Sequence, residues 1–175
     1  MNNKIIDFTD IQEEQNRFLE RLERVNSIRY QKDAFSVPMW IVLALQSELS
    51  EILNASKVHK WWDKSEVDRK HLAEECADFL SHLGNLANIL EVELIASVEE
   101  GQRTCIENQI NYLAYKITTL HWKKQFAKGK LLNNLLPGFI ELVYSLGFDI
   151  DDIKEAYRSK MDKNILELEQ ETWKN

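Results

Sequence analysis

The scarcity of turn-forming residues constrains this chain more than any other feature of its sequence. Its 175 residues include only five glycines and two prolines. Strands joined by tight hairpins need such residues at their turns, so the scarcity favours a few long helices over many short strands. Apolar residues also recur at helical spacing through most of the chain. We therefore expect an all-α protein.

Start and stop signals predict about six helices. Thr9 followed by Gln12 has the form of a capping box, and it predicts a first helix over 9–29. The stretch 36–38 ends in a proline, which a first helical turn tolerates, and it predicts a second helix that runs to residue 59. Ser65 with Asp68 forms a weaker cap pair ahead of a third helix over 67–90.

The second half of the chain gives weaker boundaries. Helices are predicted over 104–126 and over 131–146, and the second of these is bent or begins near Pro137. A final helix, capped by Asp149 or Asp151, is predicted to run to residue 172. The least patterned segment, 91–102, is predicted to be a loop or a mobile lid. Since no repeat or linker interrupts the chain, residues 1–175 are expected to form one domain, a single helical bundle.

Composition excludes several classes of protein. The formal net charge of -7 argues against a dedicated nucleic-acid-binding protein, which would carry a basic face. Cys76 and Cys105 form neither a disulfide framework nor a zinc motif. No stretch approaches the ~20 apolar residues of a membrane span, and the N-terminus does not resemble a signal peptide. We expect a cytoplasmic protein with no membrane contact.

Two pairs of acidic residues stand beside apolar runs. Glu48 and Glu51 are three residues apart, as are Glu75 and Asp78, so each pair lies on one face of its predicted helix. The short link between the second and third helices makes them antiparallel neighbours, which could bring the pairs together. Four convergent carboxylates repel one another and require cations, and oxygen ligands suit Mg²⁺ or Mn²⁺.

A simpler interpretation competes with this one, because a pair of glutamates on a helix is usually a solvated surface. The repetition of the pair on the adjacent predicted helix favours a metal site. In that case the pattern is typical of metal-assisted hydrolysis of a phosphoanhydride.

Three segments resemble the dimeric, all-α dUTPase family. Residues 51–62 read EILNASKVHKWW, residues 72–80 read LAEECADFL, and residues 156–160 read AYRSK and are followed by Asn164. The resemblance implies a homodimer that hydrolyses dUTP to dUMP and pyrophosphate with two or more Mg²⁺ ions, for which Mn²⁺ could substitute. It covers most of the chain.

The resemblance also implies roles for individual residues. The metal ligands would be Glu48, Glu51, Glu75 and Asp78, and Glu48 would also activate the attacking water. Glu74 would be a substitute ligand, or it would contact the ligand residues without binding the metal itself. His82, one turn beyond Asp78, is interpreted from its spacing either as a similar support or as a buried structural histidine. The substrate-binding residues would be Gln15, Asn54, Lys57, Lys60, Trp62, Lys160 and Asn164, with Gln12 as a rival to Gln15 for reading the uracil.

The sequence departs from the family where the nucleotide is read. Glu167 and Leu168 stand near the places of an arginine–glutamine pair, and Met161 replaces a common asparagine. A related pyrophosphatase acting on dCTP or a modified nucleotide therefore stays open as an alternative. The alternative from another class is a non-catalytic helical interaction protein, whose acidic residues would be surface charge only.

Overall fold

A computed structural model of the protein describes residues 3–26, 35–99, 101–120 and 122–170. The described chain is mostly helical, with one small two-stranded sheet, so the predicted all-α bundle is confirmed. Two predicted helix ends, at residues 29 and 172, lie outside the described residues.

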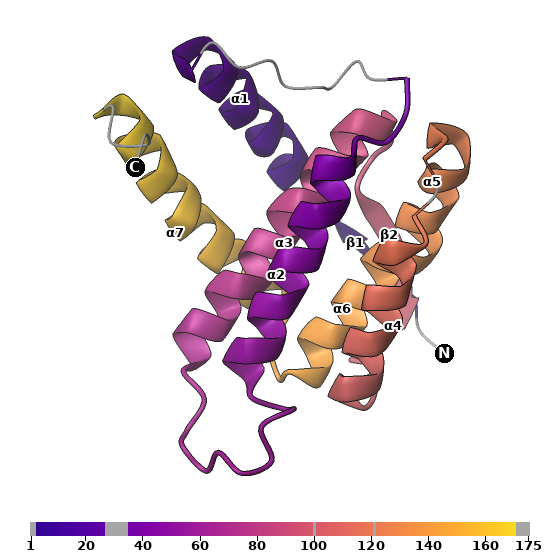
Figure 1. Cartoon of the computed structure of the whole chain (residues 1–175), viewed down its shortest axis with the longest axis vertical. Helices are drawn as coiled ribbons and strands as arrows, with labels where there is room; N and C mark the ends of the chain where they lie inside the picture. Colours follow the sequence, from indigo (N-terminus) through magenta and orange to yellow (C-terminus); the bar gives the residue numbers. More distant parts are fainter. Residues whose placement is uncertain (1–2, 27–34, 100, 121, 171–175) are drawn as a thin grey trace.

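Helices α2 (Met39–Ser56) and α3 (Arg69–Leu90) lie side by side in the middle of the molecule (Figure 1). They run antiparallel on either side of a short connection, as the sequence predicted. Helix α3 is central, because it packs against α2, against α1 (Thr9–Asn26) and against α7 (Ile150–Glu169). Its apolar residues are therefore buried along most of its length.

A second group of helices lies on the other side of the α2–α3 pair from α7 (Figure 1). It consists of α4 (Ile106–Thr118), α5 (Lys124–Lys130), the π-helix η1 (Leu131–Leu135) and α6 (Leu136–Ser145). The ring of Phe139 stacks on that of Phe79 at 5.2 Å and joins α6 to α3. The wide turn of η1 comes directly before Pro137, which has no N–H to donate to the preceding turn.

The predicted helix over 104–126 is wrong, because the chain leaves helical geometry after Thr118. The hydroxyl groups of Thr118 and Thr119 bond to the carbonyl oxygen of Tyr115 and end α4. The chain is then extended at Lys123, which forms an isolated bridge with Ser36. This pairing separates α4 from α5.

The prediction of a loop or lid over 91–102 is wrong for residues 95–99, which form a strand. Strand β1 (Asn3–Asp7) pairs antiparallel with β2 (Ile95–Glu99), in the register Asn3↔Glu99 to Asp7↔Ile95. Along β2 the buried Ala96 and Val98 alternate with the exposed Ser97 and Glu99.

The predicted capping box at Thr9 does not form. The Gln12 amide instead donates to the carbonyl of Val92 at 2.8 Å and accepts from the N–H of Leu94 at 2.9 Å. Gln12 thereby joins α1 to the segment that leads into β2. Asp7 bonds the backbone N–H of Thr9 in place of the expected cap.

Some of the other predicted helix boundaries are confirmed, and others are corrected. Helix α3 begins at Arg69 with Asp68 alone as its cap, through a 3.0 Å bond from the N–H of His71, so Ser65 plays no part in that cap. The predicted Asp149 cap of α7 is confirmed, in a capping box with Asp152. Helix α2 ends at Ser56, before the predicted residue 59, because Lys57 adopts a left-handed conformation.

No single helix in the described part of the chain is long and apolar enough to cross a membrane. Only the bent pair of Lys124–Ser145 with Ile150–Glu169 passes such a test, by length and composition.

Gly138 allows α6 to approach α4 closely, and replacing it should destabilise the bundle. A Cβ atom there would lie 3.0 Å from Tyr112 Cε1 and 3.1 Å from Leu113 Cδ2. We expect Gly138→Leu to cost about 1–3 kcal/mol through overpacking, measured as a lower midpoint of thermal unfolding by circular dichroism. Gly129→Leu is the matched control, because only Asn133 Nδ2, at 3.8 Å, lies near its Cβ position. Equal midpoints for the two variants would contradict this account of the α4–α6 contact.

Candidate active site

Three carboxylates from two helices converge beside the bundle core. Glu48 comes from α2, and Glu75 and Asp78 come from α3; each offers an oxygen within 4.8 Å of the others. The buried side chains of Leu45 and Leu49 flank Glu48 and press α2 against α3. The packing of apolar residues therefore holds the acidic groups together, and the structure places three of the four predicted metal ligands in one cluster.

The cluster carries more negative charge than its surroundings balance. Burial, with the negative charges of Asp78 and Glu75, raises the pKa of Glu48 to about 7. Burial is also the largest cause of the raised pKa values of Glu75 and Asp78. Glu48 therefore takes up a proton more readily near neutral pH than an ordinary carboxylate does. The all-oxygen donor set and its excess charge fit a divalent cation such as Mg²⁺.

Within the part of the chain that the structure describes, one lysine side chain bonds to a carboxylate of the cluster. The Lys160 ammonium, on α7, donates a hydrogen bond to Asp78 Oδ2. Its positive charge offsets part of the rise in the pKa values of all three carboxyl groups. One ammonium against three carboxylates leaves the net charge negative. The structure thus brings the predicted Lys160 to the predicted ligands across a sequence distance of 82 residues.

Glu51 lies one turn further along α2, at an exposed position. It does not join the three-carboxylate group among the described residues. Its charge nevertheless raises the pKa values of Glu48 and Glu75, which places it near the cluster.

Two histidines lie beside the cluster. His82 Nε2 is 3.8 Å from Glu48 Oε1, and burial lowers the pKa of His82 to about 4, so its imidazole is neutral at pH 7. His71 Nδ1 is 3.2 Å from Glu75 Oε1. Sequence reasoning missed His71, although its spacing of four residues from Glu75 on one helix was a usable signal.

Glu74 points to a different partner from its neighbour Glu75. Its Oε1 lies 3.9 Å from the Nζ of Lys163, which is one turn beyond Lys160 on α7. The spacing of the two lysines was the signal for this second contact. Lys163 and Lys160 therefore face two acidic residues of α3 from the same side of α7.

Lys57 organises the connection between α2 and α3. Its ammonium donates to Ser65 Oγ and to the carbonyl of Glu66 at 3.2 Å, and it forms a 3.4 Å ion pair with Asp63. The structure thus describes Lys57 ordering this connection, and its predicted contact with substrate stays a prediction.

The described structure shows no contact between the carboxylate cluster and four other predicted substrate-binding residues, which are Asn54, Lys60, Trp62 and Asn164. Asn54 is exposed near the end of α2, and Lys60 is half-buried in the connection that follows. The ring of Trp62 is 61% exposed and meets Trp61 edge-on at 5.8 Å, so it is available to a ligand and does not fill the core. Asn164 is half-buried, one turn after Lys160 on α7.

The structure separates the two glutamines that compete for reading the base. Gln12 is occupied by its bonds to the segment that precedes β2. Gln15 is buried between α1, α3 and α7, where its Oε1 accepts a 3.3 Å hydrogen bond from the Tyr157 hydroxyl. Gly84 adjoins it, since a Cβ there would lie 3.7 Å from Gln15 Cβ.

Comparison with known proteins agrees with this geometry. No curated protein and no solved structure matches the chain. A model of the dUTPase family matches residues 7–171, which include both acidic motifs and Lys160. Because the match spans nearly the whole chain, the protein belongs to the all-α dUTPase family and is a nucleoside triphosphate pyrophosphatase that hydrolyses dUTP.

Proposed function

We propose that this protein cleaves dUTP to dUMP and pyrophosphate in a reaction that depends on Mg²⁺. The observation that carries the proposal is the convergence of Glu48, Glu75 and Asp78 in a half-buried cluster. These residues would hold the metal, and Glu51 would join them from its exposed position one turn away. When bound, Mg²⁺ neutralises triphosphate oxygens and acidifies a water ligand, and Mn²⁺ could replace it.

Glu48 is the residue best suited to take a proton from the attacking water. Its carboxylate has an oxygen within 4.8 Å of oxygens of Glu75 and Asp78, so it would lie beside a water bound to a metal that the cluster holds. The neutral imidazole of His82 lies beside its Oε1 without neutralising its charge. We therefore assign His82 to positioning Glu48, and Glu74 to supporting the ligands together with Lys163.

Cationic and polar groups around the cluster would bind the nucleotide. We expect the Lys160 ammonium to change its hydrogen-bond partner from Asp78 to a phosphate oxygen when a metal ion binds the Asp78 carboxylate. Asn54, Lys57 and Lys60 would contact the phosphates from the end of α2. Asn164 would close the pocket from α7, and the exposed Trp62 would cover the nucleoside.

The environment of Gln15 favours uracil over cytosine. The Tyr157 hydroxyl lies 3.3 Å from Gln15 Oε1 and 3.4 Å from the carbonyl oxygen of Ile11, and its one hydrogen can go to either acceptor. We propose that it donates to Gln15, which would leave the Nε2 amide for a base. An amide N–H₂ donates to the 4-carbonyl of uracil but meets another donor in the 4-amino group of cytosine. This contact supports dUTP over dCTP as the substrate.

We further propose that the enzyme is a cytoplasmic homodimer. Met39 and Leu43 lie one turn apart on α2 and are 67% and 57% exposed, and Tyr115 on the neighbouring α4 is 61% exposed. Exposed apolar side chains of this size are typical of a subunit interface. Sedimentation equilibrium should give twice the chain mass of 20.6 kDa, and a monomer at micromolar concentration would contradict the dimer.

Replacing Glu75 should abolish hydrolysis without unfolding the protein. We expect Glu75→Gln to lower pyrophosphate release from dUTP by at least about a hundredfold, since loss of a ligand should cost no less than loss of a supporting group. The assay measures pyrophosphate from dUTP, dCTP, dTTP, dATP, dGTP and UTP, with Mg²⁺ and with a chelator. Glu155→Gln, an exposed change on α7, is the control with the same loss of charge and should keep full activity.

The outcomes of this assay separate the alternatives. Magnesium-dependent release with dUTP preferred supports the full proposal. Preference for dCTP would retain the metal site and overturn the role of Gln15. Full activity of Glu75→Gln would overturn the metal site, and no release by folded wild-type protein would favour the non-catalytic interaction protein.

The raised pKa of Glu48 should make the metal-free protein less stable as the pH rises. A carboxyl group with a higher pKa in the folded state binds its proton more tightly there, so the free energy of unfolding falls as pH increases from about 4.5 through about 7. We expect the melting temperature in chelator to fall over this window in the wild type and to fall less in Glu48→Gln. Mg²⁺ at pH 8 should raise the wild-type value more than that of the variant. If the melting temperatures of the two proteins change with pH in the same way, the raised pKa of Glu48 in the folded state is contradicted.

A further inference from the structure

Asn85 is a polar residue at a buried position of α3, where its neighbours on the helix are apolar. Its exposed fraction is 1%, and Leu86 and Ile89, which follow it on the helix, are fully buried. An amide in such a place costs free energy unless it is hydrogen-bonded, whereas a leucine would fill a similar volume without that cost. The residue type at this position therefore indicates a polar role for Asn85.

The amide of Asn85 lies beside His82, which is one turn earlier on the same helix. Asn85 Nδ2 is 3.5 Å from His82 Nδ1, within reach of a long hydrogen bond. The other ring nitrogen of His82, Nε2, is 3.8 Å from Glu48 Oε1 on α2. The three side chains thus form a row that leads from a buried position to the carboxylate cluster.

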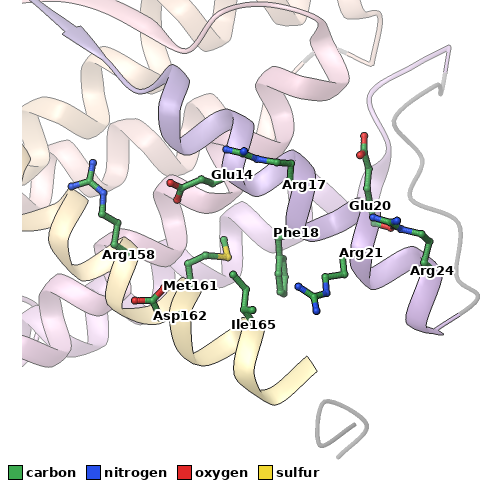
Figure 2. Close-up of a pocket in the computed structure, with 10 residues that line it drawn as sticks. All are labelled: Glu14, Arg17, Phe18, Glu20, Arg21, Arg24, Arg158, Met161, Asp162 and Ile165. Atoms are coloured by element: carbon green, nitrogen blue, oxygen red, sulfur yellow. The ribbon is translucent and has the colours of Figure 1, made fainter. Parts of the chain in front are cut away.

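The hollow between α1 and α7 does not open onto this row (Figure 2). Among the described residues, those that line the hollow come from α1 and α7 and none comes from α3. Helix α1 packs closely on α3 next to Asn85, since a Cβ atom at Gly84 would lie 3.7 Å from Gln15 Cβ. Because water is excluded from Asn85, solvent does not weaken the hydrogen bonds of its amide.

The two contacts of His82 fit one tautomer of a neutral ring. An amide N–H₂ can only donate, so His82 Nδ1 carries the lone pair that faces Asn85. The single ring hydrogen then lies on Nε2, which faces an oxygen of Glu48. The opposite orientation of the amide would move this hydrogen to Nδ1 and leave two acceptors, Nε2 and Oε1, facing each other. The row therefore gives Glu48 a neutral donor.

We propose that Asn85 is a positioning residue for dUTP hydrolysis, which fixes the Nε2–H tautomer of His82 and through it the orientation of the Glu48 carboxylate. The inference rests on the proposed role of Glu48 in the reaction. A neutral donor on Oε1 leaves Oε2 and the negative charge for a metal ion or a water. We expect the 3.8 Å contact to shorten when substrate binds, since such contacts are often long in substrate-free sites.

The tautomer of His82 can be measured directly in the metal-free protein. A long-range proton–nitrogen correlation spectrum links the carbon-bound hydrogens of each histidine ring to both ring nitrogens, and protonated and unprotonated nitrogens resonate in separate regions. Loss of signals in His82→Gln identifies those of His82. Near neutral pH, in chelator, we expect the hydrogen on Nε2 and the lone pair on Nδ1. A hydrogen on Nδ1, or on both nitrogens, would overturn the proposal.

Asn85→Leu removes the amide donor and adds no charge. The ring of His82 is then no longer fixed, so the Nδ1 resonance should shift toward the protonated region. We expect kcat for pyrophosphate release from dUTP to fall about tenfold while circular dichroism reports a folded protein. Asn133→Leu, at an exposed position of η1, is the matched control and should keep the wild-type spectrum and rate. An unchanged Nδ1 resonance in Asn85→Leu would contradict the proposal, and if this variant does not fold, the wild-type spectrum still decides.

The double variant Asn85→Leu with His82→Gln tests whether Asn85 acts through His82. Because the ring that Asn85 holds is absent there, Asn85→Leu should change kcat of His82→Gln by less than about twofold. Losses that multiply would overturn the proposal. A hydrogen on Nδ1 in an active enzyme would refute only the role of Asn85, whereas a folded wild-type protein that releases no pyrophosphate would refute the proposed function itself.

Discussion

The close packing of α2 against α3 is the interaction on which the rest of the structure depends. Leu45 and Leu49 bury one face of α2 against the central helix, and this contact carries Glu48 to the side of Glu75 and Asp78. Apolar burial is non-directional and strong enough in sum to hold charged groups where they repel. Burial, together with the repulsion of acidic neighbours, raises the pKa values of the three carboxyl groups.

The remaining helices surround this pair and supply groups that it lacks. Helix α7 crosses α3 and brings Lys160 to Asp78, and its Tyr157 orients the amide of Gln15 on α1. Gln12 holds α1 in place through bonds to the segment after α3. The two neighbouring glutamines thus differ in their surroundings: Gln12 supports the fold, and Gln15 is buried beside Tyr157.

The sequence predicted the parts of the protein that local spacing determines. Residues three apart share a helix face, and a short connection makes its helices antiparallel, so the convergence of Glu48 with Glu75 could be anticipated. Features set by distant contacts could not. The break after Thr118 depends on the pairing of Lys123 with Ser36, and the strand β2 depends on a partner strand near the N-terminus, far away in the sequence. No local pattern encodes such contacts.

The most direct test of the account is a crystal structure with Mn²⁺ and a non-hydrolysable dUTP analogue, with the ions located by their anomalous scattering. The account predicts two or more Mn²⁺ ions among Glu48, Glu51, Glu75 and Asp78, with the Lys160 ammonium moved from Asp78 to a phosphate oxygen. Ions bound elsewhere, or a cluster without Mn²⁺ in which Lys160 still bonds Asp78, would contradict it.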